Sequence, residues 1–270
     1  MLSFCVVSLF AFAAILGDYS LRAQSAANDR IRLTLDTTEA ECVLSILALR
    51  REGKAISETD WQKLFDTEPY RRLKKLEMQI GEMYHRSDLA FTDEDFKKFV
   101  MSDGLLNRST QLDATLHKWR TVDLRASAER VLKYLPLEAT INAKVYPTIK
   151  PNSNSFVFEP GSNPAIFLYL DPEKSAAKFE NTVAHELHHI GLASLGPVYE
   201  KKLAGLTERA RQAAQWMGAF GEGMAMLAAA GGRTSIPTQP AQKPNARAGA
   251  VIWLTSILIF SRSMVSSSIS

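Results

Sequence analysis

Residues 165–191 read AIFLYLDPEKSAAKFENTVAHELHHIG, and they predict a strand that runs directly into a helix. Residues 165–170 are a continuous apolar run of strand length, bounded by turn-forming residues. Asp171 favours the N-cap of a helix, and Pro172 suits the first helical position. We expect the helix to pass through the histidine cluster and to end near Gly191 or shortly after it.

Three of the five histidines lie in residues 185–189, which read HELHH. Residues four apart differ by about 40° around a helix, so His185 and His189 project side by side. Their imidazoles can supply two of the four ligands of a tetrahedral zinc ion. Glu186 lies about 80° from the midpoint of that pair, near enough to reach a water at the metal but not aimed to bind it. This position predicts a catalytic base.

His188 offers a second way to pair with His185. In that arrangement Glu186 would lie about 130° from the midpoint of the two histidines, turned away from the metal. The apolar residues of the helix gather opposite the pair of His185 and His189, which gives the helix a core face and a metal face: they are Phe179, Val183, Leu187 and Ile190. We therefore interpret His188 as a neighbour of the site.

The third ligand is expected to be a carboxylate, because no histidine follows His189 and the two cysteines offer no metal site. Three glutamates are available: Glu200, Glu208 and Glu222. Glu208 follows His189 after eighteen intervening residues, as in some zinc aminopeptidases, but its neighbours indicate an exposed helix face. Glu222 lies in residues 221–225 (GEGMA), which resemble the context of the ligand glutamate in many gluzincins, and the small residues there let two helices approach closely. We favour Glu222, with Glu208 and then Glu200 as the alternatives.

Residues 185–189 (HELHH) followed by residues 221–225 (GEGMA) resemble the gluzincin metallopeptidases, and in particular a bacterial family of uncharacterised zinc-dependent peptidases. The specific similarity covers about residues 140–232. The resemblance implies a Zn²⁺ cofactor, held by His185, His189 and Glu222, and the hydrolysis of peptide bonds with Glu186 as base. It also implies a zincin fold, in which a strand edge binds the substrate as an added strand.

Two further roles follow from the resemblance. Residues 165–170, which come just before the metal helix, are our candidate for the strand that binds substrate. A tyrosine or histidine usually stabilises the oxyanion in such enzymes. Tyr169 and Tyr199 are nearby, but neither matches a motif, so this role stays unassigned.

The rest of the chain predicts an α+β fold that is mostly helical. Helix-start signals recur between residues 38 and 135, at Thr38, Thr59 and Thr92, after an alternating strand at 31–36. Residues 140–149 and 155–158 are expected to be extended, and a second helix is expected over 198–230. We divide the chain into a helical N-terminal region (27–135) and a zincin-like catalytic domain (136–232), with a small sheet, a metal-binding helix and a ligand helix.

The two ends differ from the body. Residues 2–16 are almost wholly apolar and small residues follow, which predicts a signal peptide over 1–26 and export to the periplasm or the medium. Residues 233–270 form an atypical tail, a linker plus a short apolar segment that could associate weakly with a membrane. Its lack of acidic residues favours the hypothesis of a frame-shifted reading. In that case part of the catalytic domain would be missing and activity would be in doubt.

The charge distribution limits the classes of partner that we expect the protein to bind. The formal net charge is +3, but Arg233, Lys243, Arg247 and Arg262 follow the last acidic residue, so the body is close to neutral. Nothing here favours nucleic-acid binding, which needs basic residues gathered on the folded body. We expect a peptide or protein substrate. The alternative function is a catalytically inactive protein that binds zinc or associates with a membrane.

Overall fold

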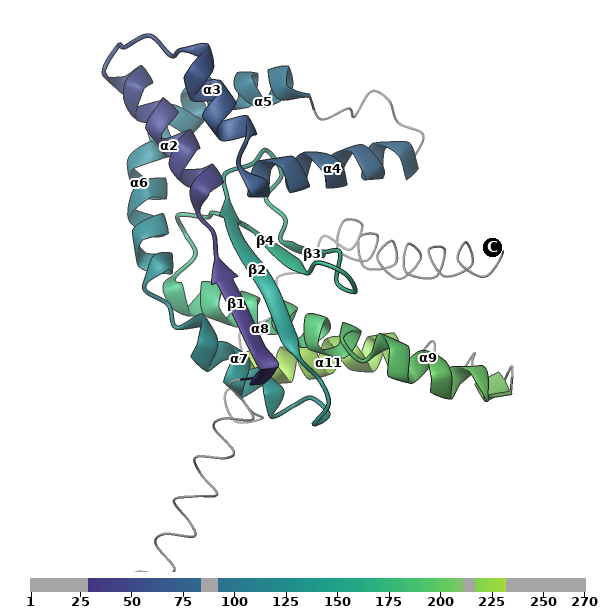
Figure 1. Ribbon diagram of the computed structural model, residues 1–270. Helices are drawn as coiled ribbons and strands as arrows, with labels where there is room; N and C mark the ends of the chain where they lie inside the picture. The colour runs from purple at the N-terminus through teal and green to yellow at the C-terminus, as the bar shows by residue number, and fades with distance from the viewer. Residues whose placement is uncertain (1–28, 84–91, 208, 211–216, 232–270) are drawn as a thin grey trace, which may run out of the picture.

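The computed structural model describes residues 29–83, 92–207, 209–210 and 217–231, which form the predicted α+β fold, mostly helical (Figure 1). The strands are β1 (Ile31–Leu35), β2 (Ile141–Thr148), β3 (Phe156–Phe158) and β4 (Ala165–Tyr169). The helices are α2 (Thr38–Arg51), α3 (Glu58–Phe65), α4 (Glu68–Met83), α5 (Asp93–Val100), α6 (Asp103–Arg120), α7 (Leu124–Leu132), α8 (Ala176–Ala193), α9 (Gly196–Ala204) and α11 (Met217–Ala230).

The four strands form one mixed sheet in the order β1-β2-β4-β3. β1 pairs with β2 in parallel, with Ile31 opposite Ile141, and β2 pairs with β4 in parallel. β3 pairs with β4 in the antiparallel direction. The expectation that residues 165–170 offer a free strand edge is therefore wrong. β4 lies inside the sheet, and the short strand β3 forms the edge beside it.

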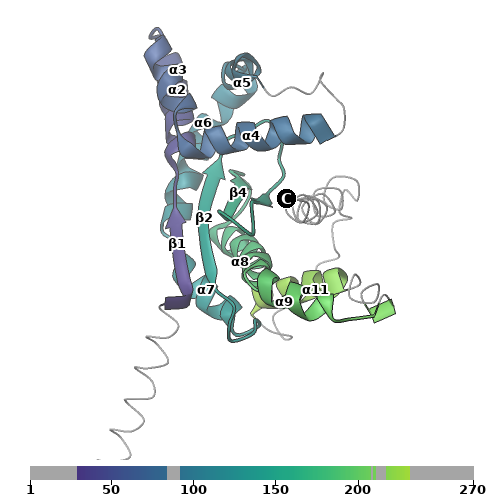
Figure 2. The same ribbon diagram turned by 45° about the vertical axis from the view of Figure 1, so that its right-hand side comes forward.

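Both faces of the sheet are covered, which explains why β4 reads as an unbroken apolar run. Side chains alternate along a strand. Ile166 and Leu168 enter the main core, while Phe167 joins a smaller core on the opposite face. There Leu73 of α4 packs against Tyr146 and the neighbouring aromatic rings. In both views α4 lies close to the C-terminal end of β2 (Figures 1 and 2).

The helix that carries the histidine cluster begins later than the sequence predicts. α8 starts at Ala176, and its N-cap is Ser175, whose side chain accepts a hydrogen bond from the backbone N–H of Lys178 at 3.2 Å. Asp171 is not the N-cap, because its carboxylate accepts instead from the backbone N–H of Glu173, two residues on, at 3.0 Å. That local bond makes a turn rather than a helix start.

The single helix expected over residues 198–230 is also wrong. α9 ends at Ala204, residues 205–207 are not helical, and α11 starts at Met217. Strand β1 and helix α7, which precede Pro136, share the main core with β2, β4 and α8. The division of the chain at residue 136 stays a prediction.

Several predictions lie outside the described residues. These are the signal peptide at 1–26, the tail at 233–270 and the alternative ligand Glu208. None of the helices in the described part of the chain is both long enough and apolar enough to cross a membrane.

Candidate metal centre

His185 and His189 lie on α8, which packs firmly into the core. Phe179 stacks on Trp119 of α6, with ring centroids 4.2 Å apart. Val183 and Leu187 are fully buried, as is nearly all of Ile190. The predicted core face is thus confirmed. His185 and His189 project from another side of the helix, where they are only partly buried.

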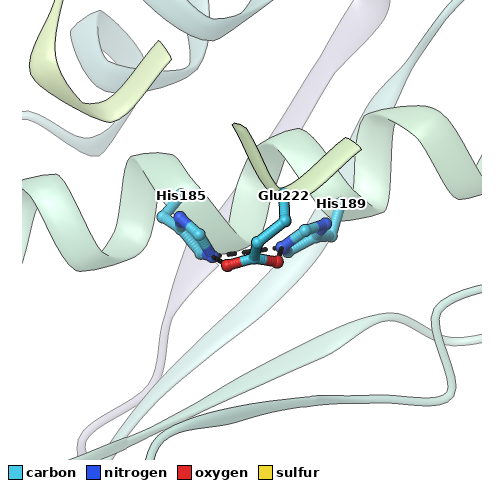
Figure 3. Close-up of side chains that lie close together, drawn as sticks. All are labelled: His185, His189 and Glu222. Carbon is cyan, nitrogen blue, oxygen red and sulfur yellow. Dashed lines mark hydrogen bonds and ion pairs between the residues drawn. The ribbon is translucent and has the colours of Figure 1, made fainter. Parts of the chain in front are cut away.

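α11 brings Glu222 to this pair because it packs closely on α8. Ala225 and Ala228 are fully buried, so small side chains occupy the contact side of the helix. A Cβ atom on Gly221 would lie 3.6 Å from Cδ1 of Leu192 on α8. Figure 3 shows the Glu222 side chain reaching from α11 to a point between the two imidazole rings.

The three side chains converge through their polar atoms. Nε2 of His185 lies 3.0 Å from Oε1 of Glu222, and Nε2 of His189 lies 3.2 Å from Oε2. The two Nε2 atoms are 3.1 Å apart. Ligand atoms at about 2.0–2.1 Å from a tetrahedral zinc ion lie about 3.3 Å from one another. The separations among these donor atoms therefore suit a single zinc ion.

The charge states suit a metal as well. Burial lowers the pKa of His185, although the nearby Glu222 carboxylate opposes this. Burial also lowers the pKa of His189 to about 3, helped by the neighbouring His185 and His188. Both imidazoles are therefore neutral near pH 7, which is the form that binds zinc.

Glu186 is not one of the three clustered side chains. This agrees with its position, about 80° around the helix from the midpoint of His185 and His189. Its pKa is raised to about 7, mainly by burial and also by the negative charge of Glu222, while the positive charge of Lys174 opposes both. A carboxyl group with a pKa near the working pH is suited to both taking and returning a proton. Sequence reasoning missed Lys174, which comes just before α8. No motif marks it, and only the fold brings its charge near Glu186.

The other candidates lie elsewhere. His188 is 1% exposed, and its ring centroid lies 6.2 Å from that of His189. Glu200 is exposed on α9 and is not part of the cluster. The hydroxyl of Tyr169 accepts a hydrogen bond from Nη1 of Arg108 on α6, at 3.2 Å. Tyr199 is exposed on α9. Neither tyrosine gains a catalytic role from these contacts.

A histidine pair on one helix, a carboxylate from a second helix and a partly buried glutamate next to the first histidine define a candidate centre of the zinc-peptidase class. The chain belongs to the family described as "Putative zinc dependent peptidase (DUF5700)", whose family model matches residues 61–250. The match includes most of the helical N-terminal region. It also runs past Gly232, where the sequence alone suggested that the family pattern ends. No curated protein and no solved structure matches the chain.

Proposed function

We propose that this protein is a zinc-dependent peptidase with His185, His189 and Glu222 as metal ligands and Glu186 as the catalytic base. The observation that carries the proposal is the convergence of the three donor groups on one point, with all donor atoms within 4.8 Å of one another. The family description agrees with the metal and with the reaction class.

The donor set fits zinc in its chemistry. Two neutral imidazoles and one carboxylate are the ligands of many catalytic zinc sites, which keep a fourth position for water or substrate. When bound, zinc supplies Lewis-acid chemistry, since it polarises a peptide carbonyl and makes water more acidic.

Glu186 would carry the protons of the reaction. As the carboxylate, it accepts a proton from the water that attacks the peptide carbonyl. As the acid, it returns this proton to the nitrogen of the leaving amine when the C–N bond breaks. Lys174 keeps part of the Glu186 population ionised near neutral pH, because its positive charge opposes the effects of burial and of Glu222.

The substrate would be held in an extended form. β3 is the edge strand beside β4, and α8 packs near it. An edge strand presents unpaired backbone groups to a peptide, which can add to the sheet as a further strand. We assign this role to β3 in place of β4.

We also propose that the protein acts outside the cytoplasm on peptides or unfolded proteins, on the basis of the apolar run at residues 2–16. Fractionation of cells that express the full chain would test this. Recovery of the protein from the periplasm or medium, shortened at its N-terminus, is the expected result. Intact protein in the cytoplasm would contradict the proposal.

The Glu186→Gln variant tests the catalytic proposal. The amide has nearly the same shape but cannot take a proton, so peptide hydrolysis should fall by about 10²–10⁴-fold while about one zinc per chain is retained. Hydrolysis of a mixture of quenched fluorescent peptides and zinc content by atomic absorption are the two measurements. Glu200→Gln, at an exposed glutamate of α9, is the matched control and should hydrolyse as the wild type does.

Two results would contradict the proposal. Full hydrolysis by the Glu186→Gln variant would remove Glu186 from the mechanism. A wild-type protein that binds zinc but hydrolyses no peptide would be a zinc-binding module without peptidase activity.

A further inference from the structure

α11 has an unusual surface for a helix that is partly exposed. Glu222 is the only charged residue in its sequence, MGAFGEGMAMLAAA. Large apolar side chains are nevertheless exposed on it, with Met226 at 62% and Met224 at 38%. Exposed apolar side chains close to a functional group often mark a binding surface.

The helix geometry separates these side chains into two groups. Ala225 and Ala228 are fully buried and mark the side of α11 that packs on the core. Met226 lies about 40° around the helix from Glu222, and Met224 lies about 160° from it. Met226 is thus next to the carboxylate, one turn along the same side, whereas Met224 is on the other flank.

Gly223, the residue after Glu222, lies on the exposed surface of α11 with open space around it. A Cβ atom built on it would meet no atom within 4 Å. Residues three or four apart are neighbours on a helix surface, so Met226 adjoins both Glu222, four residues before it, and Gly223, three residues before it. Together they form a patch that combines a metal-ligand candidate, an open space and an exposed apolar wall.

We propose that Gly223 and Met226 form a subsite that receives an uncharged, apolar side chain of the peptide substrate, close to the bond that is cleaved. The inference rests on the proposed function and adds a substrate class to it. In the proposed mechanism the peptide reacts where His185, His189 and Glu222 converge, and Met226 lies one helical turn from Glu222 on the same side of α11. No charged group of α11 other than Glu222 is there to attract a charged side chain.

Two substitutions test the subsite in the full, zinc-loaded protein. Gly223→Leu adds an apolar side chain at a position where a Cβ atom meets nothing within 4 Å, and it also favours the helix. We expect it to keep its zinc and to lower kcat/KM about tenfold for peptides with Leu or Phe at the recognised position, with a smaller effect for Ala. Met226→Lys should lower kcat/KM for apolar peptides by a similar factor and raise it for peptides with Glu at that position.

Met224→Lys is the matched control, since it places the same charge on the same helix but on the flank away from Glu222. It should leave the preference unchanged. The assay is digestion of a peptide mixture that varies every position, with cleavage sites read by mass spectrometry. Light scattering on each variant reports the oligomeric state.

The outcomes separate this inference from the proposed function. A preference for apolar residues that shifts in both subsite variants, but not in Met224→Lys, supports the subsite. Unchanged preferences in zinc-loaded, active variants overturn the subsite alone. The subsite is also overturned if Met226→Lys dissociates a dimer without changing preference, because a second copy would then cover this patch. Absence of hydrolysis by the wild type, with zinc bound, overturns the proposed function itself.

Discussion

Glu222 is one of three glutamates that follow His189, and it reaches the histidine pair from a separate helix. We predict that Glu222→Ala lowers zinc affinity by at least about 100-fold, because loss of a ligand costs more than loss of an outer contact. Glu208→Ala should bind zinc as the wild type does. Competition with a fluorescent chelator measures both affinities.

Glu222→Ala and Glu208→Ala can be compared directly, because each removes one glutamate carboxylate. Loss of zinc in Glu208→Ala with retention in Glu222→Ala would reverse the assignment. Equal loss in both would point to a general failure to fold, which circular dichroism would reveal.

The residues of the candidate centre differ in how far the sequence could indicate them. His185, Glu186 and His189 stand on one helix, so their relative directions follow from residue spacing alone. Glu222 was favoured only through its small neighbours and a resemblance, since its approach depends on packing between two helices. Lys174 could not be found, because its effect on Glu186 arises from the path of the chain before α8.

At the scale of elements, two substitutions test at which residue α8 begins. Ser175→Ala removes the N-cap hydrogen bond and should lower the free energy of unfolding by about 1 kcal/mol. Asp171→Ala removes only a turn contact and should cost less than about 0.5 kcal/mol. Urea denaturation of the two variants gives both values. A larger effect at Asp171 than at Ser175 would contradict the observed helix start.

Helix starts were predicted with mixed success, and the start of α5 was predicted correctly. Thr92 caps α5 as expected, through the backbone N–H of Asp95. Before α8, both Asp171 and Ser175 are good capping residues, and their local chemistry does not decide between a turn and a cap. For α3 the cap is Ser57, two residues before the predicted Thr59. Errors of this kind come from competition among neighbouring polar side chains.

At the scale of the whole molecule, Glu39 of α2 makes stability depend on pH. Its side chain is fully buried and accepts a hydrogen bond from the backbone N–H of Ile149 at 3.0 Å. Burial raises its pKa from an ordinary value of 4.5 to about 8. Between these values the folded chain holds a proton that the unfolded chain has released, so stability falls as pH rises.

We predict that Glu39→Gln removes this penalty. Relative to the wild type, the variant should gain on the order of 2 kcal/mol in the free energy of unfolding between pH 5 and pH 8. Denaturant titrations at both pH values measure the difference, in which the contributions of other titrating groups cancel. A constant difference between the two proteins across this range would show that Glu39 does not change its protonation there.

The assembly of the whole sheet could not be predicted from the sequence. The strand at residues 31–35 was expected from its alternation, but nothing local indicates that it pairs in parallel with β2. The packing of α4 against the opposite face also depends on distant aromatic residues such as Tyr146 and Phe167. Periodicity reports which side of an element is apolar and does not report what covers it.

The pairing of β1 with β2 has a consequence for how the molecule is made. Ile31 meets Ile141, and Glu39 meets Ile149, across 110 residues of chain. Contacts between such distant positions form slowly, because a long loop must close before they can stabilise anything. β1 therefore cannot pair until β2 has been synthesised, and Glu222 is synthesised later still. Until then the chain has no assembled candidate centre, so under the proposed function a newly made chain could not yet hydrolyse peptides.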